Sequence, residues 1–174
     1  LIKMMVGRDV AVVPQQLDIK TDEKILEVKN LNKAGNFADI NFSLYKGEVL
    51  GITGLVGAGR SEVARAIYGI EPANAGEIVL EGKKLEIKSA PEGLKCGIAY
   101  LPEDRRSQGI IAAQSVANNL TIASLRNTKT SLGLLDFKKE SELADNMIKT
   151  LDIRPVIPEM LAGKLSGGNQ QKVV

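Results

Sequence analysis

The sequence of 174 residues contains no histidine and no tryptophan, and it has a single cysteine, Cys96. Without an imidazole, every mechanism that needs histidine as a base, a pH sensor or a metal ligand is excluded for this chain. A single cysteine excludes an internal disulfide and is typical of proteins from a reducing compartment. Aromatic residues make up only 3% of the chain, which leaves few rings that could stack on nucleic-acid bases.

Long apolar runs and a strong net charge are missing as well. No run approaches the ~20 apolar residues that a membrane-spanning helix needs, and no signal peptide is visible. The net charge is +2 and the lysines are scattered, so we predict no nucleic-acid partner. A hydrophobic share of 44% and a charged share of 25% are typical of an ordinary globular domain with a core of its own.

The first 24 residues differ in character from the rest. Residues 1–9 read LIKMMVGRD, an apolar run closed by Gly7, which is typical of the end of a helix. Residues 10–24 contain one proline and mixed polar residues without a helical period, and they are predicted to be a linker. We expect a new domain to begin at Ile25.

Strands dominate the front of this domain and helices its end. Alternating patterns predict strands over residues 25–31 and 38–45, and a hairpin over 76–87 that turns at Gly82. The apolar runs VLGITG (49–54) and CGIAYLPED (96–104) predict buried strands, the first of the parallel type. Helices are expected over 115–125 and 136–152. The second of these has one apolar face, made of Phe137, Ala144, Met147, Ile148 and Leu151.

Residues 54–61 read GLVGAGRS, which matches the phosphate-binding pattern G-x-x-x-x-G-K-[ST] at every position except Arg60. Glycines in such a loop permit positive φ and let backbone N–H groups approach phosphate oxygens. The predicted helix through SEVARAIYG adds the positive end of its dipole. Ser61 occupies the place of the hydroxyl that ligates Mg²⁺. We therefore interpret this stretch as a nucleotide site rather than as a glycine turn without a ligand.

Arg60 stands where this loop usually has a lysine. Arginine keeps the positive charge, but its broad planar fork does not replace a slim lysine at a tight site. We expect nucleotide binding to survive and the contact to the transition state to be lost. The dinucleotide fingerprint G-x-G-x-x-G is excluded, because Glu62 stands where its last glycine would be.

A second motif, LSGGNQQK, covers residues 165–172. Ser166 offers a hydroxyl, and Gly167 and Gly168 offer bare N–H groups, at the predicted start of a helix. Taken alone, this motif is more often a plain helix N-cap than an anion site. Combined with the phosphate loop, a β-rich front and an intervening helical segment, it makes the sequence resemble an ATP-binding cassette.

The resemblance is closest to the C-terminal cassette of the ATP-binding subunits of bacterial simple-sugar importers, the ribose and galactose class. It is carried by GEVLGITGLVGAGRSE, IAYLPEDRRSQGI and LSGGNQQKVV. It implies an α/β fold over residues 25–174, with a P-loop cassette core, an antiparallel β subdomain and a helical subdomain, truncated before the Walker B strand. The β subdomain and P-loop core would cover about 25–109, and the helical subdomain with its signature motif about 110–174. Residues 1–24 would be the tail of a preceding cassette and a linker.

The resemblance also implies ATP and Mg²⁺ as cofactors, with Ser61 and Glu103 as the Mg²⁺ ligands. No residue of this chain is expected to be catalytic. The residues implied in nucleotide binding lie in the loop, after the second buried strand and in the signature: Gly54, Gly57, Ala58, Gly59, Arg60, Ser61, Glu62, Glu103, Ser166, Gly167, Gly168, Asn169 and Gln170.

Three residues near these motifs have more than one interpretation. Glu103 replaces the glutamine that most cassettes place at the end of this strand, and a carboxylate there adds negative charge beside phosphates. Asp104 is better explained as part of a solvated turn, paired with Arg105 and Arg106. Phe37 is the candidate for stacking on adenine and is equally well explained as a core residue.

The function implied is that of half of the ATP engine of a sugar importer. In this class two cassettes pair head to tail, so the loop with Arg60 would be degenerate, and the signature would complete the ATP site of the partner cassette. The full-length subunit would hydrolyse ATP. This chain alone would not, because the general base of the family lies beyond Val174.

The partners implied are the first cassette of the same full-length chain, the membrane permease subunits and, indirectly, a periplasmic or lipoprotein sugar-binding protein. The subunit would lie peripherally on the cytoplasmic face of the membrane. An open sheet edge predicts that this chain associates with itself. Two alternatives remain: a soluble cassette ATPase without a transport role, which would carry inserted segments, and a non-cassette P-loop kinase or GTPase, which would have no use for the signature.

Overall fold

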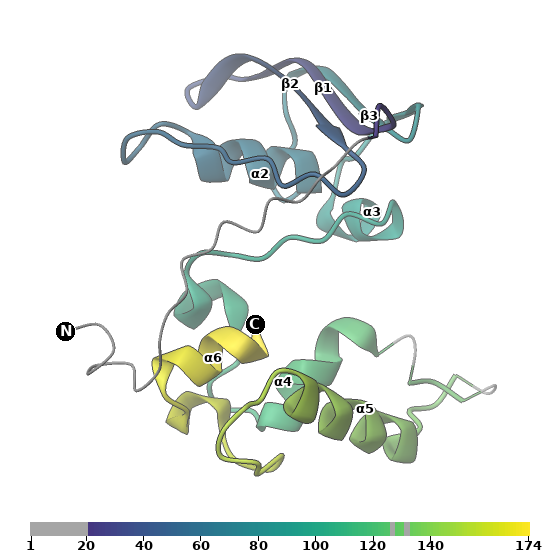
Figure 1. Cartoon of the computed structure of the whole chain (residues 1–174), viewed down its shortest axis with the longest axis vertical. Helices are drawn as coiled ribbons and strands as arrows, with labels where there is room; N and C mark the ends of the chain where they lie inside the picture. Colours follow the sequence, from purple (N-terminus) through teal and green to yellow (C-terminus); the bar gives the residue numbers. More distant parts are fainter. Residues whose placement is uncertain (1–20, 126–127, 131–132) are drawn as a thin grey trace. The chain divides into compact units, whose positions relative to one another are not determined.

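The structure is a computed structural model that describes residues 21–125, 128–130 and 133–174. The helix end predicted over residues 1–9, and the linker up to residue 20, lie outside the described residues. The chain divides into two compact units, one that ends at Tyr100 and one that comprises Leu101–Val174. Figure 1 shows both, and each is described by itself.

The first unit is built on a four-stranded antiparallel sheet with the order β2-β1-β3-β4. The strands are β1 (Lys24–Lys33), β2 (Phe37–Tyr45), β3 (Ala75–Leu80) and β4 (Lys83–Leu85). Val28 of β1 lies opposite Phe42 on one side and Ile78 on the other. Glu81 and Gly82 both have positive φ, 48° and 75°, as a two-residue hairpin turn requires. The predicted strands 25–31 and 38–45 and the predicted hairpin are confirmed.

Helix α2 (Arg60–Tyr68) covers one face of this sheet, as predicted for the segment after the phosphate loop. The side chains between them form the first core cluster: Val28, Leu31, Val63, Ala66, Ile67 and Ile78. Lys33, at the end of β1, pairs with Glu71 beyond α2 at 2.7 Å. The hydrogen bond from Lys33 lowers the pKa of Glu71 below its ordinary value.

A short helix that the sequence reasoning missed, α3 (Ala90–Lys95), follows the sheet. Its signal was present as Ser89, at the N-cap, and Glu92 three positions later, the spacing of a capping box. Gly93 is buried against the backbone carbonyl of Tyr68 at the end of α2, where a Cβ atom would collide. The glycine therefore lets α3 approach α2 closely.

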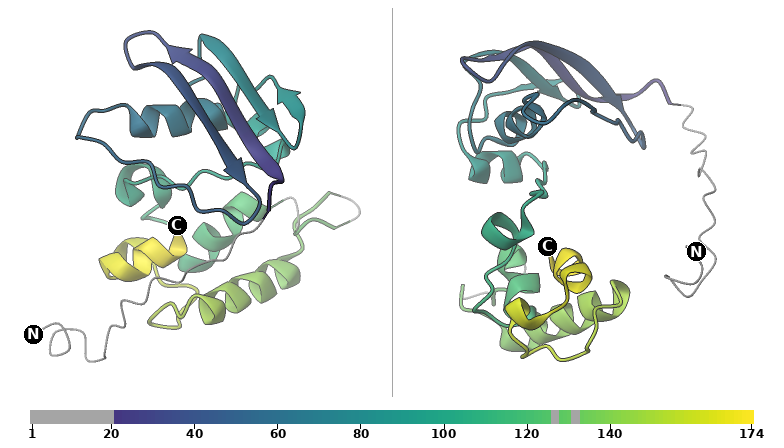
Figure 2. Two further views of the ribbon diagram at one scale, coloured as in Figure 1. Left: turned by 45° about the horizontal axis from the view of Figure 1, so that its top comes forward. Right: turned by 90° about the vertical axis from the view of Figure 1, so that its left-hand side faces the viewer.

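The second unit is helical (Figure 2). It contains the π-helical turn η1 (Arg105–Gly109), α4 (Val116–Thr121), η2 (Ile122–Ser124), α5 (Phe137–Thr150), η3 (Ala162–Lys164) and α6 (Gly167–Val173). Ser115 caps α4 and Asp136 caps α5, each by accepting a backbone N–H. The second core cluster lies among these helices: Val116, Leu120, Ile148, Ile153, Leu165 and Val173. The helices expected over 115–125 and 136–152 are confirmed.

The apolar face predicted for α5 is buried only in its middle part. Ala144 and Ile148 are 1% exposed, but Phe137 is 76% exposed and Leu151 is 42% exposed. Helix α4, which packs on α5, has six residues and α5 has fourteen. At roughly 1.5 Å per residue, the shorter helix cannot cover the whole length of the longer one. The helical periodicity therefore predicted which residues share the apolar face of α5, but it did not predict how much of that face other helices cover.

The two buried strands predicted over 49–54 and 96–104 are wrong. Neither stretch is a strand, and Val49 is 81%, Ile52 53% and Leu101 63% exposed. A buried parallel strand needs hydrogen-bonded neighbours in its sheet, and no described residue pairs with either stretch. The part of the cassette fold that the described residues form is the antiparallel sheet with its helices. The predicted self-association stays a prediction.

Within the described ranges, none of the helices combines the length and the apolar character that crossing a membrane would require.

Candidate functional site

The phosphate loop has a backbone geometry suited to an anion. Gly57 and Gly59 both have φ of +82°, and Ala58 between them keeps a negative φ. Alternation of left-handed and right-handed residues turns successive N–H groups toward one side, which makes a concave anion site. The Ala58 N–H donates to the carbonyl of Leu55 at 3.1 Å and so closes a turn within the loop. The remaining loop N–H groups are therefore the better candidates for phosphate contacts.

The glycines of this loop are required for different reasons. At Gly59 the positive φ is combined with crowding, since an added Cβ would lie 3.0 Å from the carbonyl oxygen of Asn36. At Gly57 only the backbone conformation calls for glycine, because the space beside it is open. An added Cβ at Gly54 would lie 3.6 Å from Cδ of Arg60. The Arg60 side chain thus folds back over the beginning of the loop, as a phosphate ligand at this position must.

Ser61 and Glu62 lie in the first turn of α2 and are half-buried. Phe37 is half-buried against the first core cluster and also lies beside Gly59, so both interpretations of this residue remain open. Among the described residues there is no group of three or more Asp, Glu, His or Cys side chains that could hold a metal alone.

The turn after Pro102 is held by Asp104. Its Oδ1 accepts the N–H groups of Arg106 at 3.0 Å and Ser107 at 3.2 Å, and its Oδ2 accepts the Ser107 hydroxyl at 2.6 Å. These hydrogen bonds, the one from the Ser107 hydroxyl first, lower the pKa of Asp104 below its ordinary value. Asp104 therefore stabilises the turn, as expected, but among the described residues no ion pair joins its carboxylate to the side chain of Arg105 or Arg106. Glu103 is exposed, and it belongs to a different unit from Ser61, so their shared Mg²⁺ stays a prediction.

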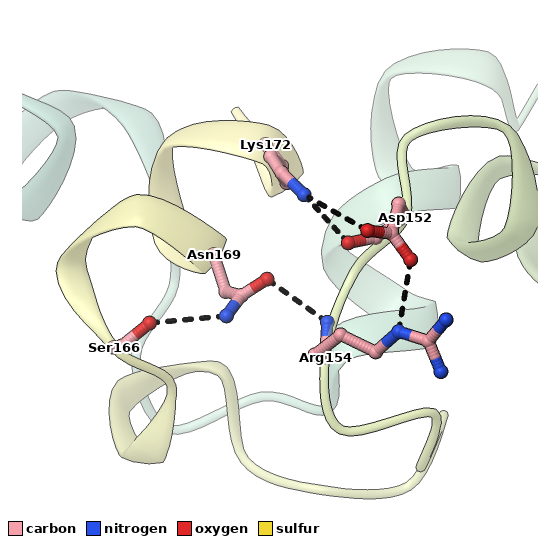
Figure 3. A network of polar contacts seen from close by, with 5 residues as sticks. All are labelled: Asp152, Arg154, Ser166, Asn169 and Lys172. Carbon is pink, nitrogen blue, oxygen red and sulfur yellow. Dashed lines mark hydrogen bonds and ion pairs between the residues drawn. The ribbon is translucent and has the colours of Figure 1, made fainter. Parts of the chain in front are cut away.

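The signature motif begins at Ser166, which occupies the N-cap position of α6. Its hydroxyl does not cap the helix; it accepts a hydrogen bond from Nδ2 of Asn169 at 3.0 Å instead (Figure 3). Ser166, Gly167 and Gly168 are all exposed. The first turn of α6 thus presents one hydroxyl and two glycines to the outside, which is the arrangement expected of a motif that contacts a ligand.

Asn169 also connects the signature to the turn that follows α5. Its Oδ1 accepts the backbone N–H of Arg154 at 2.9 Å. Arg154 Nε donates to Oδ1 of Asp152 at 2.8 Å, and Lys172 Nζ donates to the carbonyl oxygen of Asp152 at 2.6 Å. Figure 3 shows these contacts as one network. The sequence reasoning missed Asp152, Arg154 and Lys172, and no motif marks the first two.

The last predicted ligand, Gln170, faces inward. It is 7% exposed, and its Nε2 lies 3.1 Å from the carbonyl oxygen of Leu165 and 3.4 Å from those of Ala162 and Gly163. This amide stabilises the passage from η3 to α6. The burial supports a structural role for Gln170 and gives no support to the predicted nucleotide contact.

The two signature glycines differ in their surroundings. An added Cβ at Gly167 would lie 2.8 Å from Nη2 of Arg105, whereas Gly168 has nothing within 4 Å. The Nε atom of Arg105 is buried and makes no hydrogen bond. The Arg105 guanidinium therefore packs beside Gly167. A side chain introduced at position 167 would collide with it, whereas a side chain at position 168 would meet no neighbour.

Comparison with known sequences places these features in a family. The sequence model of the ABC transporter family matches residues 37–174, so the chain belongs to the ABC transporter family. Solved structures agree on the fold: the dimeric bacterial cassette MJ0796 superposes with a TM-score of 0.68 at 20% identity, over 86% of this chain and 66% of that one. CbiO1 of Clostridium perfringens superposes with a TM-score of 0.66 at 23% identity, over 87% and 59%.

Curated relatives narrow the resemblance further. The chain is 40% identical to the ribose import ATP-binding protein RbsA of Oceanobacillus iheyensis and 39% identical to RbsA of Bacillus subtilis. Both alignments cover 100% of this chain and 35% of the relative. The chain thus spans about a third of the length of these curated relatives.

We predict that Gln170→Glu destabilises the second unit, because it places a carboxylate among carbonyl oxygens. The free energy of unfolding should fall by at least the cost of an unsatisfied buried polar group, which is about 1–3 kcal/mol. Gln171→Glu makes the same chemical change at the exposed neighbouring position and should alter stability little. Urea unfolding of both variants measures the difference. Equal stability of the two variants would contradict the structural role of Gln170.

Asp104 should make the η1 turn sensitive to acid. Its pKa is lowered in the folded chain, so its contribution to stability is complete above the ordinary pKa of 3.8 and is lost as the pH falls through the lower folded value. An NMR titration should show the Ser107 N–H signal shift in this acid range. In Asp104→Asn the shift should disappear. If the signal moves equally in both proteins, another group controls the turn.

Proposed function

We propose that this chain is the ATP-binding half of the motor subunit of a sugar-importing ABC transporter. The observation that carries this proposal is the presence of two separate motifs in a chain of this family: a glycine loop with two left-handed residues, Gly57 and Gly59, and an exposed signature. The relatives named as ribose import ATP-binding proteins support the sugar class. ATP and Mg²⁺ are the proposed cofactors.

We assign the two motifs to two different ATP sites. The loop formed by Gly54, Gly57, Ala58, Gly59 and Arg60 would hold a nucleotide through its N–H groups and the Arg60 guanidinium, with Ser61 and Glu103 toward Mg²⁺. Because a guanidinium does not reproduce the contacts of a slim ammonium at a tight site, this loop would bind nucleotide without supporting hydrolysis.

The signature would instead complete a nucleotide site whose phosphate loop belongs to a second cassette. Ser166 offers its hydroxyl there, and Gly167 and Gly168 let the backbone approach phosphate oxygens without a Cβ in between. Bound Mg-ATP supplies the phosphoanhydride that is cleaved in such a site. The residues of this chain would bind and orient its phosphate, and the base that activates water would come from outside these 174 residues. The chain alone would therefore be inactive.

The proposed partners are a first cassette in the same full-length subunit, membrane permease subunits and, through them, a sugar-binding protein. Exposed apolar side chains line a hollow on the second unit, among them Ile111, Ile122 and Phe137. This surface is suited to the contact with a permease, which would hold the subunit at the cytoplasmic face of the membrane.

The membership of the ABC transporter family argues against a kinase or GTPase, and the sugar-import relatives argue against a cassette without a transport role.

The test compares Gly168→Asp with Gly168→Asn in the reconstituted transporter. Position 168 is open, so both side chains fit, and they differ only in the charge presented to a phosphate. We expect Gly168→Asp to lower sugar-stimulated ATPase on the order of 10²–10³-fold, the loss typical of one transition-state donor, and Gly168→Asn to lower it much less. Arg60→Ala should weaken nucleotide occupancy and retain most of the turnover.

The opposite pattern would contradict the proposed function. If Arg60→Ala abolishes turnover while Gly168→Asp stays near wild type, the active and degenerate sites have been assigned the wrong way round. If both variants retain full turnover, neither motif takes part in the ATPase reaction.

A further inference from the structure

The chain contains six aromatic residues, three phenylalanines and three tyrosines, and no tryptophan. All six lie within the described ranges, so the structure places every aromatic ring of the chain. Their positions matter for a nucleotide site, because stacking on an aromatic ring is a common way for a protein to hold a base. The six residues are Phe37, Phe42, Tyr45, Tyr68, Tyr100 and Phe137.

Three of these rings are engaged elsewhere. Tyr68 and Tyr100 are stacked on each other, with ring centroids 5.7 Å apart. Tyr68 is the last residue of α2, so it lies at the opposite end of this helix from the phosphate loop, roughly 12 Å along the axis. Phe137 belongs to the second unit, where it lines the hollow of that unit. Any ring that the first unit offers beside the loop must therefore come from β2, which contains the other three.

The three aromatic residues of β2 are not free beside the loop either. Tyr45 ends β2, roughly 25 Å along the strand from its first residue, Phe37. Phe37 and Phe42 are both partly buried against the first core cluster. Phe37 also lies beside the loop, since its Cβ would be 3.7 Å from a Cβ added at Gly59. The ring that lies beside the loop is therefore already committed to the core.

The turn between β1 and β2 offers little selectivity for a base. Asn36 lies next to the loop, with its carbonyl oxygen 3.0 Å from a Cβ added at Gly59. The side-chain ammonium of Lys33 is held by Glu71, through its carboxylate at 2.7 Å and its carbonyl oxygen at 3.1 Å. Ala34 and Gly35 have no polar side chain. The exposed side-chain amide of Asn36 can both donate and accept, so it suits the polar edge of any base.

We propose that the loop formed by residues 54–61 recognises the polyphosphate of a nucleotide and not its base, so that it binds nucleoside triphosphates of any base about equally. The inference rests on the proposed function, because it names the class of ligand for the proposed nucleotide site in this loop. The groups that the loop offers are suited to anionic oxygens: backbone N–H groups, the Arg60 guanidinium and the positive end of α2. A base adds affinity only where a ring or a selective polar group meets it, and the surroundings of this loop provide neither.

The experiment is isothermal titration calorimetry of the 174-residue chain, which contains a single phosphate loop, with the Mg²⁺ complexes of ATP, GTP and ribose 5-triphosphate. Ribose 5-triphosphate carries the same phosphates and sugar as ATP and lacks only the base. We expect the three dissociation constants to agree within about threefold, because stacking on even one aromatic ring changes affinity roughly 5- to 150-fold. Arg60→Ala should weaken the binding of all three ligands by the same factor, on the order of tenfold.

Phe37→Leu tests the ring beside the loop, and Phe42→Leu is its matched control. Both variants remove one ring from the same strand and from the side chains packed against the same core cluster, so both should lower thermal stability. We expect neither variant to change the ratio of the affinities for ATP and ribose 5-triphosphate. Circular dichroism during thermal unfolding shows whether each variant is folded at the temperature of the titration. The comparison of the three ligands in the wild-type chain does not depend on either variant.

Two results would overturn the inference, and they differ in what they mean for the proposed function. If ATP binds more tightly than GTP or ribose 5-triphosphate by more than this threefold range, the base is recognised, so the inference fails and the proposed function stands. A loss of that preference in Phe37→Leu, but not in Phe42→Leu, would then identify Phe37 as the stacking ring. If the folded chain binds none of the three ligands, the loop is not a nucleotide site, and the proposed function fails together with the inference.

Discussion

The hydrogen bonds of Asn169 to Ser166 and to Arg154 join the first turn of α6 to the turn that follows α5. Because the Asn169 amide oxygen accepts the backbone N–H of Arg154, the orientation of the amide is fixed, and its NH₂ group donates to the hydroxyl oxygen of Ser166. The other elements serve this arrangement: Gln170 anchors the start of α6 to the preceding turn, and Lys172 attaches its end to Asp152. An exposed motif thus gains a defined geometry from its hydrogen-bonded neighbours.

The phosphate loop of the first unit is formed by different means. There the backbone alone would form the proposed anion site, through left-handed Gly57 and Gly59 on either side of Ala58. The side chain of Arg60 lies beside Gly54 at the start of this loop, and its broad guanidinium would not reproduce the contacts of a slim ammonium. The proposed site would therefore bind a nucleotide without supporting hydrolysis. This is the physical basis for giving the two motifs of one chain different roles.

The sequence predicted those elements that carry a clear local pattern. Local alternation marks the strands 25–31 and 38–45 and the hairpin at Gly82. Helical periodicity marks the helix after the phosphate loop. The buried strands predicted over 49–54 and 96–104 were wrong, because the formation of such strands depends on neighbouring strands that no pattern within the stretch reveals. In the site, the motifs were found by their spacing. The inward position of Gln170 and the contacts of Asp152 and Arg154 arise from tertiary packing, which leaves no local signal.

The central claim is that Ser166 donates to a nucleotide held by the phosphate loop of another cassette. The most direct measurement is the structure of the full-length subunit with a non-hydrolysable ATP analogue and Mg²⁺. The account predicts that Oγ of Ser166 lies within hydrogen-bond distance of the terminal phosphate, with Asn169 still donating to the same oxygen. The account would be contradicted by a nucleotide in the loop formed by residues 54–61 that contacts Ser166 of the same chain, or by a bound nucleotide that leaves Ser166 exposed to water.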